Sequence, residues 1–363
     1  MKKICIVMPS MAGGGAEKMI SYISNKLIEN KNNKVILILF EKTGENLENL
    51  SSNLRIVNLK TKIGIVGMIS LIRVLRIEQP DIAFFALGPL NAVFSPFILF
   101  FKKVKFIARE TNIPSIINKL QSKKKKIYLL INLFYKITYN FFDIIIVQSQ
   151  DMKEDLKKNY NIAPHKLIVI NNLIDSKLIS TNKKLDLESI ELLYREKKIY
   201  GLAMGRLTQQ KGYDLLVEQL KGVDKNIVIY ILGNGELKDK LIEKIYKYKL
   251  ENNIKILPFD RNPYKYLAKS DFFILPSRVE GFPNALIEAL GCGVPAIVNN
   301  CKGGINEIII EGVNGKILDF NQDVDIAKNI REVIKYNRNW IIKDTFNRFN
   351  KEIILKKYMQ LFE

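Results

Sequence analysis

Histidine and cysteine are scarce in this sequence. The 363 residues include one histidine, His165, and three cysteines, Cys5, Cys292 and Cys301. A single histidine in the loop-like segment IAPHKL excludes a histidine-rich metal site and argues against a Ser-His-Asp triad, so we expect His165 at the surface. The cysteines lack CxxC or other ligand-like spacing, and no signal-peptide pattern precedes them. We therefore expect reduced thiols in a cytoplasmic protein.

One uncharged segment, Ile82–Phe101, reaches the approximate length that a membrane-spanning helix requires. Gly88, Pro89 and Pro96 interrupt it, and its first residues resemble a strand. We predict a buried strand, IAFFAL, followed by a helix, NAVFSPFILFFKK, and no membrane span.

Acidic residues are outnumbered by basic ones. The chain carries 57 Lys and Arg against 37 Asp and Glu, a formal net charge of +20. Residues 1–172 hold 26 basic and 12 acidic residues, so +14 of the excess lies in the first half. Such an excess favours an anionic partner: nucleic acid, an acidic membrane surface or a phosphate-bearing small molecule. Net charge alone does not distinguish among these three partners. An AT-rich genome, which favours lysine codons, would also explain part of the excess.

Apolar strands and amphipathic helices alternate along the first half of the chain. A strand, KKICIVMPS, runs into a helix whose apolar residues recur at helical spacing. Further predicted strands are KVILILF at Lys34–Phe40, LRIVNL, IAFFAL, KFIARE and DIIIVQS, with helices near 64–77 and 122–141. This alternation predicts a parallel, doubly wound sheet that ends with KLIVINNLID.

The pattern restarts after the polar stretch STNKKLDLESIE, which we interpret as a hinge. The predicted strands here are KKIYGLAMGRL, NIVIYILGNG, NIKILPF, DFFILPS, PAIVNN and GKILDF. We therefore predict an α/β protein of two Rossmann-like, doubly wound domains that face a central cleft, residues 1–172 and 173–339. The last segment, 340–363, is predicted to be helical and to return to the first domain.

Glycine-bearing loops follow several predicted strands, where open parallel sheets bind their ligands. Gly13-Gly14-Gly15 precedes a helix, and glycine there lets the backbone approach an anion. A tight turn that needs positive φ is the alternative, and the triplet is not the GxGxxG of dinucleotide-binding proteins. Gly233-Asn234-Gly235 ends a later strand in the same way, and Gly303-Gly304 forms another such loop.

The segment Met204–Gly212, MGRLTQQKG, is more specific. Arg206 and Lys211 lie five residues apart at a strand–helix junction, with a glycine beside each. A guanidinium is a fork of donors suited to phosphate oxygens and an ammonium is a point charge, so the two could clamp a pyrophosphate. Two solvated charges on a loop are the alternative.

The segment Glu280–Pro295, EGFPNALIEALGCGVP, carries two glutamates eight residues apart. Asn284 is suited to cap a helix over Ala285–Leu290, whose N-terminus is a second anion site. Glu288 lies one turn into that helix and could accept two hydrogen bonds from a vicinal diol such as ribose. Glu280 precedes the turn and would reach another part of the same ligand.

These motifs together resemble the large retaining glycosyltransferase family 4, which has the GT-B fold. The resemblance is carried by GGGAEK, NNLID, MGRLTQQKG, LGNGELKDKL, DFFILPSRVEGFPNALIEALGCGVPAIV and GGINEIIIEGVNG. It covers nearly the whole chain and is strongest over residues 200–318, where five motifs agree in order and spacing. Glu280 and Glu288 match the E-x7-E signature of that family.

The resemblance implies a role for each motif residue. Arg206 and Lys211 would hold the donor diphosphate, Glu280 would contact hydroxyls of the donor sugar, and these three would form the catalytic set. Glu288 would bind the ribose. The other implied donor contacts are Gly14, Gly15, Gly205, Gly233, Gly235, Pro258, Phe259, Gly281, Phe282, Pro283, Asn284, Ala285 and Leu286. The implied chemistry is front-face transfer with retention of anomeric configuration, without a metal or another cofactor, because the two cations and the helix N-terminus stabilise the charge.

The chain departs from this family pattern after the strand KFIARET. Many relatives carry a histidine there, whereas this chain has Glu110-Thr111. Either Arg109, Glu110 or the backbone takes over the contact to the sugar or acceptor, or that contact is missing. An ion pair between Glu110 and Arg109 is the other interpretation.

The resemblance also implies substrates. We expect a hexose or N-acetylhexosamine from a nucleotide sugar, by default a UDP-sugar. The expected acceptor is a polyprenyl-diphosphate-linked glycan, in O-antigen, lipopolysaccharide or other surface polysaccharide synthesis. Lys102-Lys103, Lys105, Lys123–Lys126 and the aromatic INLFYKITYNFF could seat the first domain peripherally on the anionic cytoplasmic face of the inner membrane. A core-facing helix is the alternative for INLFYKITYNFF.

Two other classes of protein are alternatives. A GT-B nucleotide-sugar epimerase or hydrolase would need further acid–base residues in the cleft, and the scarcity of histidine counts against it. A basic nucleic-acid-binding protein is suggested by charge alone, and the sequence has no recognisable base-reading or aromatic-platform motif.

Overall fold

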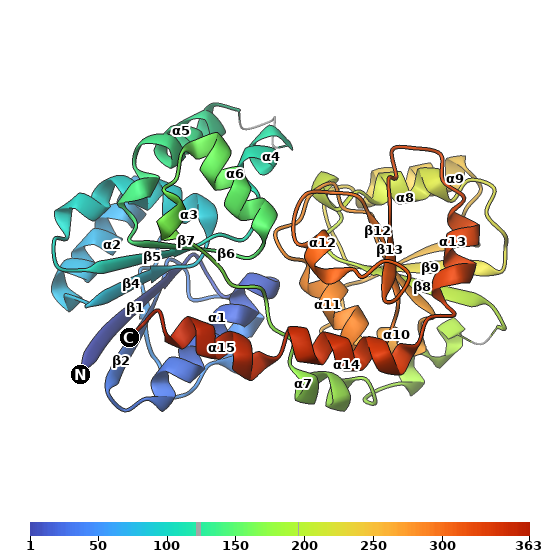
Figure 1. Cartoon of the computed structure of the whole chain (residues 1–363), viewed down its shortest axis with the longest axis horizontal. Helices are drawn as coiled ribbons and strands as arrows, with labels where there is room; N and C mark the ends of the chain where they lie inside the picture. Colours follow the sequence, from blue (N-terminus) through green and yellow to red (C-terminus); the bar gives the residue numbers. More distant parts are fainter. Residues whose placement is uncertain (121–124, 195) are drawn as a thin grey trace. The chain divides into compact units, whose positions relative to one another are not determined.

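The structure, a computed structural model, describes residues 1–120, 125–194 and 196–363. The chain forms two compact units. The first comprises Met1–Asn172 with Glu352–Glu363, and the second comprises Leu173–Lys351. Each unit is built around one parallel β-sheet with helices on both faces (Figure 1).

The first unit has a seven-stranded sheet in the order β3-β2-β1-β4-β5-β6-β7. Its strands are β1 Lys2–Met8, β2 Asn33–Leu39, β3 Arg55–Asn58, β4 Ile82–Phe85, β5 Lys105–Arg109, β6 Ile144–Val147 and β7 Leu167–Val169. β1 pairs with β2 in parallel over its full length, from Lys2 opposite Asn33 to Met8 opposite Leu39. Because helices cover both faces of the sheet, β1 is a continuous apolar run after Lys3, and its last five residues are buried.

The helices of the first unit form two layers. They are α1 Gly15–Glu29, α2 Ile65–Glu78, α3 Gly88–Phe94, α4 Pro114–Leu120, α5 Lys125–Ile137, α6 Gln150–Tyr160 and α15 Lys351–Met359, with 3₁₀ turns η1 Glu45–Asn49, η2 Ser95–Phe100, η4 Tyr139–Phe141 and η5 Pro164–Lys166. Figure 1 shows α2, α5 and α6 over one face of the sheet, with α1 and α15 over the other.

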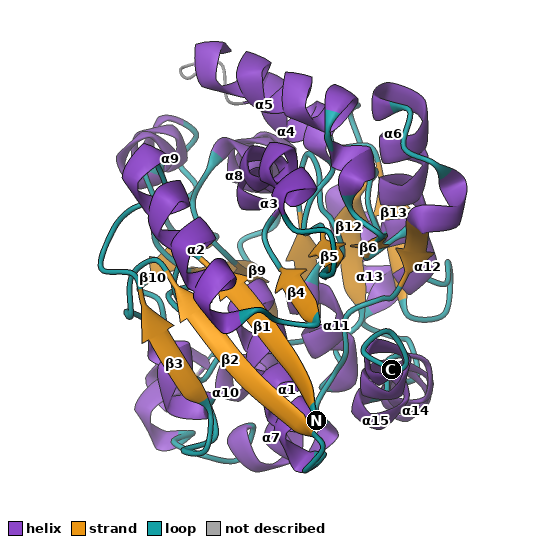
Figure 2. Ribbon diagram, turned by 90° about the vertical axis from the view of Figure 1, so that its left-hand side faces the viewer, coloured by secondary structure: helices purple, strands orange, loops and turns teal. Residues whose placement is uncertain are grey.

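The second unit has a six-stranded sheet in the order β10-β9-β8-β11-β12-β13. Figure 2 labels β9, β10, β12 and β13 of this sheet. Its strands are β8 Ile199–Met204, β9 Ile227–Leu232, β10 Ile254–Leu257, β11 Phe272–Leu275, β12 Ala296–Asn299 and β13 Gly315–Leu318. Its helices are α7 Ser176–Asn182, α8 Tyr213–Gln219, α9 Lys238–Lys247, α10 Tyr264–Lys269, α11 Asn284–Gly291, α12 Ile305–Ile308, α13 Ile326–Val333 and α14 Arg338–Arg348, with 3₁₀ turns η6 Glu188–Tyr194 and η7 Gln209–Lys211. The two parallel sheets confirm the predicted pair of Rossmann-like domains.

The uncharged run Ile82–Phe101 folds as predicted. It forms the buried strand β4, the helix α3 and the 3₁₀ turn η2. Among the described residues, no helix is long and apolar enough to cross a membrane.

The prediction of a hinge at STNKKLDLESIE is wrong. The segment completes α7 and enters η6, and Ile190 is 2% exposed in the core of the second unit. The polar segment offers few apolar residues at a regular spacing, so nothing in the sequence indicated that Ile190 is buried.

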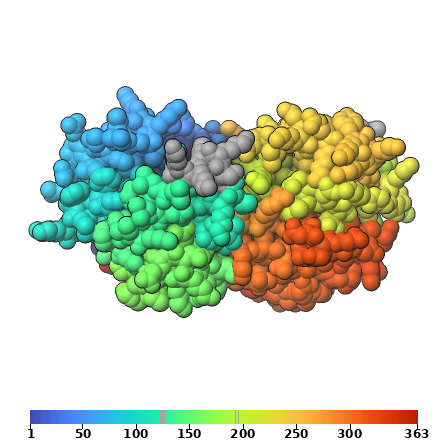
Figure 3. Space-filling model, turned by 90° about the horizontal axis from the view of Figure 1, so that it is seen from above, coloured from blue at the N-terminus to red at the C-terminus, as the bar shows by residue number. Residues whose placement is uncertain are grey.

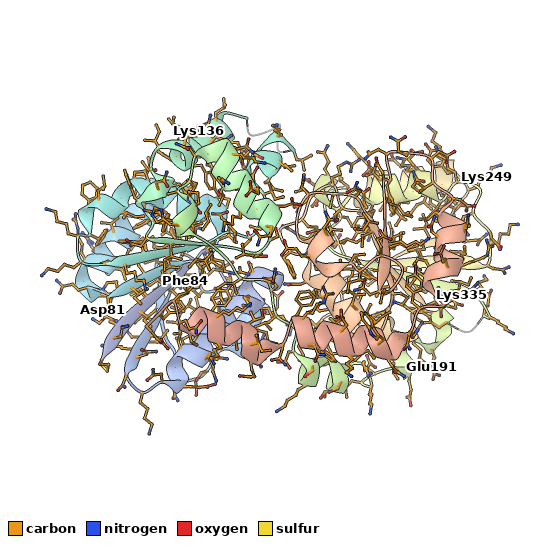
Figure 4. The ribbon with its side chains drawn as sticks, viewed as in Figure 1. Asp81, Phe84, Lys136, Glu191, Lys249 and Lys335 are labelled. Atoms are coloured by element: carbon orange, nitrogen blue, oxygen red, sulfur yellow. The ribbon has the colours of Figure 1, made fainter. Side chains whose placement is uncertain are left out.

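Two predicted long helices are interrupted. Residues 122–124 of the helix predicted near 122–141 lie outside the described residues, and the rest is divided between α5 and the turn η4. The segment after Trp340 is divided between α14 and α15. α15 and the residues after it belong to the first unit. There the Phe362 ring meets the edge of Phe84, which Figure 4 labels, at 5.5 Å between centroids.

Candidate functional site

Two glycine loops meet at the carboxyl ends of β8 and β9. Gly205 has a φ of +148° and Gly233 a φ of +156°. A Cβ atom at Gly233 would lie 2.1 Å from the Gly205 carbonyl oxygen, and one at Gly235 would lie 2.5 Å from the Leu207 carbonyl oxygen. Only glycine permits this approach. The strand order reverses between β8 and β11, so the loop after β8 lies where open parallel sheets bind ligands.

Lys211 and Glu280 form an ion pair in this region. The Lys211 Nζ lies 2.7 Å from the Glu280 Oε1, and the Ser277 hydroxyl donates to the same oxygen at 2.6 Å. Glu280 is only 5% exposed, so these two hydrogen bonds offset the cost of removing its charge from water. The sequence assigned the two residues to different parts of a ligand, and the structure brings their side chains into contact.

Arg206 has a different environment from Lys211. Its side chain is exposed, and within the described residues its guanidinium makes no hydrogen bond or ion pair. Lys211 is half-buried and shares its charge with Glu280. Of the two cations in MGRLTQQKG, one is therefore compensated and one is open to an anion.

The loop Gly303-Gly304 fixes the backbone of Glu280. Gly303 has a φ of +133°, and a Cβ there would lie 2.3 Å from the Glu280 carbonyl oxygen. The Glu280 amide donates to the Lys302 carbonyl at 3.0 Å. A Cβ at Gly304 would lie 2.3 Å from the Phe282 ring, which is buried. The close approach of Gly303 to Glu280 was not foreseen from the sequence.

The helix α11 begins one residue earlier than predicted. Pro283 occupies the cap position in an extended conformation with no side-chain capping bond, and Asn284 is the first helical residue. The prediction that Asn284 is the N-cap is therefore wrong, because proline with its fixed φ already turns the chain into the helix. Leu286, Ile287 and Leu290 are fully buried, which anchors the helix in the core.

Glu288 lies on the half-exposed side of α11. The hydroxyl of Tyr264, from α10, donates to its Oε1 at 2.9 Å. Burial and the neighbouring Glu288 carboxylate raise the pKa of Tyr264 well above its ordinary value, so the phenol stays protonated. Tyr264 therefore orients this carboxylate, and no spacing rule linked the two residues.

Two of the predicted donor contacts, Pro258 and Phe259, directly follow β10. Pro258 and Phe259 are both exposed, and the Phe259 side chain is 65% exposed. An exposed aromatic ring at the carboxyl end of a strand next to β9 is compatible with base contact. Gly281 is buried beside Phe282, and Ala285 is half-buried as the second residue of α11.

The glycine triplet lies in the first unit at the start of α1. Gly13 has a φ of +127°, so a turn explains glycine at that position. Gly14 precedes α1 and Gly15 begins it, and a Cβ at Gly14 would meet no heavy atom of the described chain within 4 Å. An alanine at position 14 would therefore meet no steric clash with the described chain.

Glu110 faces the interior of the first unit. It is 2% exposed, and its carboxyl group accepts hydrogen bonds from Asn91 at 3.2 Å, from Tyr135 at 3.2 Å and from Tyr139. Burial raises the pKa of Glu110 from 4.5 to about 8. A Cβ at Gly88 would lie 2.3 Å from this carboxyl group, so the surrounding chain is closely packed.

Arg109 is fully buried and does not form a hydrogen-bonded ion pair with Glu110. Its Nε donates to the Tyr358 hydroxyl at 3.0 Å and its Nη2 to the Asn172 Oδ1 at 2.8 Å. The predicted Glu110–Arg109 pair is thus wrong, because neighbouring residues of a strand point to opposite faces. These internal partners favour structural roles for both residues over contact with a sugar.

The described residues contain no group of three or more His, Cys, Asp or Glu side chains that could hold a metal ion. Cys5, Cys292 and Cys301 form no disulfide.

Comparison with known proteins adds the family. The profile "Glycosyltransferase Family 4" matches residues 13–178, and the profile "Glycosyl transferases group 1" matches residues 186–351. The chain is 31% identical over 238 residues to the N-acetylgalactosamine-N,N'-diacetylbacillosaminyl-diphospho-undecaprenol 4-alpha-N-acetylgalactosaminyltransferase of Campylobacter jejuni, covering 65% of this chain and 62% of that protein. Three relatives that are at least 30% identical, this one among them, are matched over 58–62% of their own length.

Other similarities extend over the whole chain. The amylovoran biosynthesis glycosyltransferase AmsD of Erwinia amylovora is 24% identical over 365 residues, with 99% of both chains covered. Among solved structures, Anabaena HepE in complex with UDP-glucose has a TM-score of 0.81, 17% identity and 99% coverage of both chains, a likeness that concerns the fold. The chain belongs to the glycosyltransferases of the GT-B fold, with a family 4 region followed by a group 1 region.

Proposed function

We propose that this protein is a retaining glycosyltransferase that uses a UDP-sugar donor and a lipid-linked glycan acceptor. It transfers a hexose or N-acetylhexosamine during synthesis of a surface polysaccharide such as O-antigen. The observation that carries the proposal is the Lys211–Glu280 ion pair, together with the exposed guanidinium of Arg206 in the same segment after β8. A carboxylate and two cations at this edge of the sheet suit a sugar diphosphate.

The similar proteins support the choice of substrates. HepE was solved with UDP-glucose, the name of the Campylobacter enzyme specifies a diphospho-undecaprenol-linked acceptor, and AmsD is named for biosynthesis of amylovoran. None of these names fixes the sugar that this chain transfers.

The proposed mechanism divides the work among four side chains. Arg206 and Lys211 stabilise the charge that develops on the departing diphosphate. An ammonium has three N–H donors, so Lys211 can keep its bond to Glu280 while donating to a phosphate oxygen. Glu280, held by Ser277, contacts a hydroxyl of the donor sugar, and Glu288, held by Tyr264, accepts hydrogen bonds from the ribose. The leaving phosphate accepts the proton of the acceptor hydroxyl in a front-face reaction.

No metal or other cofactor is assigned a step in this proposal. The two cations and the N-terminus of α11 supply the positive potential that a divalent ion supplies in other transferases.

We also propose that the protein acts at a membrane surface. The exposed side chains of α5 support this location. One side of this helix and the residues after it is buried through Ile131, Tyr135 and Tyr139, as the core-facing interpretation of INLFYKITYNFF expects. The other side exposes a second set of apolar side chains, Ile127, Leu129, Leu130, Leu133 and Ile137. Lys136 adds a cation on the outer side of α5 (Figure 4). An apolar face with a basic flank is typical of helices that bind the bilayer interface.

Two other elements of the first unit also expose apolar side chains. α2 exposes Ile65, Val66 and Ile69, and η2 exposes Leu99 and Phe100. Figure 3 looks onto this side of the first unit, where α2 and α5 both reach the surface. Exposed apolar side chains in such number mark an interaction surface.

The predicted lysines contribute unequally to this surface. Lys102 and Lys103 are exposed directly after η2, whereas Lys105 donates internally to the Leu361 carbonyl at 2.8 Å. The predicted cluster Lys123–Lys126 lies outside the residues whose side chains the structure describes. Each lysine near an anionic bilayer contributes about 1 kcal/mol to binding.

A donor screen tests the proposed activity. The purified chain is incubated with UDP- and GDP-sugars, with and without lipid extracted from bacterial membranes, and nucleotide release and product mass are recorded. Acceptor-dependent UDP release with a glycolipid gain of one sugar is expected. UDP release that is independent of any acceptor would instead indicate the epimerase or hydrolase class, and no release with any donor would contradict both.

A further inference from the structure

Tyr213 is the first residue of α8 and follows directly after MGRLTQQKG. Its side chain is 4% exposed, and its ring belongs to the core formed with Leu207 and Leu216. A phenol that is buried to this extent normally has a hydrogen-bond partner.

The hydroxyl of Tyr213 lacks such a partner. Within the described residues it makes no hydrogen bond. Among the described residues, the side-chain polar atoms that are fully enclosed and have no hydrogen-bond partner belong to Ser24, Arg109, Asn262 and Tyr336. The Tyr213 hydroxyl is not one of them. The hydroxyl oxygen is therefore not completely enclosed, although only 4% of the residue is exposed.

This hydroxyl is aimed at the loop after β8. A Cβ atom at Gly205 would lie 3.2 Å from the Tyr213 Oη and 3.4 Å from the Lys211 Cε. Because Gly205 has no side chain, the space that its Cβ would occupy is empty. The Tyr213 hydroxyl and the Lys211 side chain both lie next to this space. Glu280 lies close enough to act on the phenol, since burial and the Glu280 carboxylate together raise the pKa of Tyr213 well above its ordinary value. The group is a protonated donor.

The geometry points to Tyr213 as a further donor-binding residue, whose hydroxyl donates a hydrogen bond to the distal phosphoryl group of a nucleoside diphosphate. This inference rests on the proposed function, because it places that diphosphate beside Lys211. A phenol adds a directed hydrogen bond without adding charge, and the Lys211 ammonium is already compensated by Glu280. Gly205 is then required for space as well as for its φ.

The test is the substitution Tyr213→Phe, which removes one oxygen and keeps the packed ring. Affinities for UDP and UMP, or for GDP and GMP if the wild type prefers guanine, are measured by titration calorimetry. Since hydrogen bonds to charged groups contribute about 1.5–3 kcal/mol, the diphosphate should bind about tenfold or more weakly to the variant, and the monophosphate should bind equally well. The melting temperature should not change, because the hydroxyl has no partner within the described chain to lose.

Tyr248→Phe is the matched control. Its hydroxyl donates to the Glu218 Oε1 at 3.0 Å, and neither residue belongs to the proposed site. This variant should bind the nucleoside diphosphate as the wild type does.

The outcomes separate this inference from the proposed function. If the wild type binds neither UDP nor GDP, both are overturned. A second outcome is that the wild type binds the diphosphate and Lys211→Ala weakens binding, whereas Tyr213→Phe does not. That result would overturn only the role of Tyr213. Equal weakening of the diphosphate and the monophosphate would also overturn it, since the lost bond would then not be to the distal phosphoryl group.

Discussion

Lys211 and Glu280 are 69 residues apart in the sequence, and their side chains meet at 2.7 Å in the second unit. The shared carboxylate oxygen also accepts from Ser277. This contact makes Glu280 the residue that holds the lysine at the end of β8. It also means that changes to either residue affect stability as well as chemistry.

The two cations should therefore differ in their mutational effects. Arg206→Ala and Lys211→Ala should each lower kcat about 100-fold, because both lose charge stabilisation of the leaving group. Only Lys211→Ala should also lower the free energy of unfolding, since it leaves the nearly buried Glu280 carboxylate without its cation. Steady-state kinetics and urea denaturation measure the two effects, and unchanged kcat in either variant would contradict the diphosphate role.

A second substitution isolates the stability effect. In the Lys211→Ala background, Glu280→Gln removes the uncompensated charge and keeps an acceptor for Ser277. The double variant should be more stable than Lys211→Ala alone and equally low in turnover. A double variant less stable than the single one would show that the ion pair is not the source of the loss.

Glu288 and Tyr264 should act on donor affinity. Glu288→Ala should raise the donor KM strongly, and Tyr264→Phe should raise it less, because the carboxylate remains but loses the 2.9 Å bond that orients it. A hydrogen bond to a charged group contributes about 1.5–3 kcal/mol, so the Tyr264→Phe effect should be about tenfold. Steady-state kinetics with varied donor concentration measure these KM values. A Tyr264→Phe variant with the wild-type KM would contradict the proposal that Tyr264 orients Glu288.

Glu110 should make the stability of the protein depend on pH. Its pKa is raised by burial from 4.5 to about 8, so between these values the folded state binds more protons than the unfolded state. Stability contributed by the protonated carboxyl is fully present below about pH 4.5 and is lost as the pH rises towards about 8. Glu110→Gln, which stays neutral, should flatten this loss. Urea midpoints from pH 5 to pH 8.5 measure it, and parallel curves for wild type and variant would refute the assignment.

The exposed apolar face of α5 should govern membrane binding. Leu129→Asp with Leu133→Asp should reduce flotation with vesicles that contain anionic lipid, and both side chains are exposed, so the fold should persist. Charge reversal at Lys102 and Lys103 should weaken binding mainly at low salt. As a control, Ile353→Asp changes an exposed apolar residue on α15, on the other face of the sheet (Figure 1). Equal vesicle binding by all variants would contradict the proposal that this surface binds the membrane.

The sequence by itself determined the two parallel sheets, because their central strands are buried on both faces and so appear as uninterrupted apolar runs such as Ile4–Met8. It also located the loops after β8 and before α11, since glycine and charged residues after a strand leave a local signature.

Only the tertiary structure decided which side chains meet. The bond between Lys211 and Glu280, the phenols directed at Glu288 and at the space beside Gly205, and the inward turn of Glu110 all depend on contacts between distant segments. Spacing along a chain records the period of a helix or strand, and it carries no record of which polar groups share a buried position. Burial decides that, because each enclosed polar group must find its partner from whatever element packs against it.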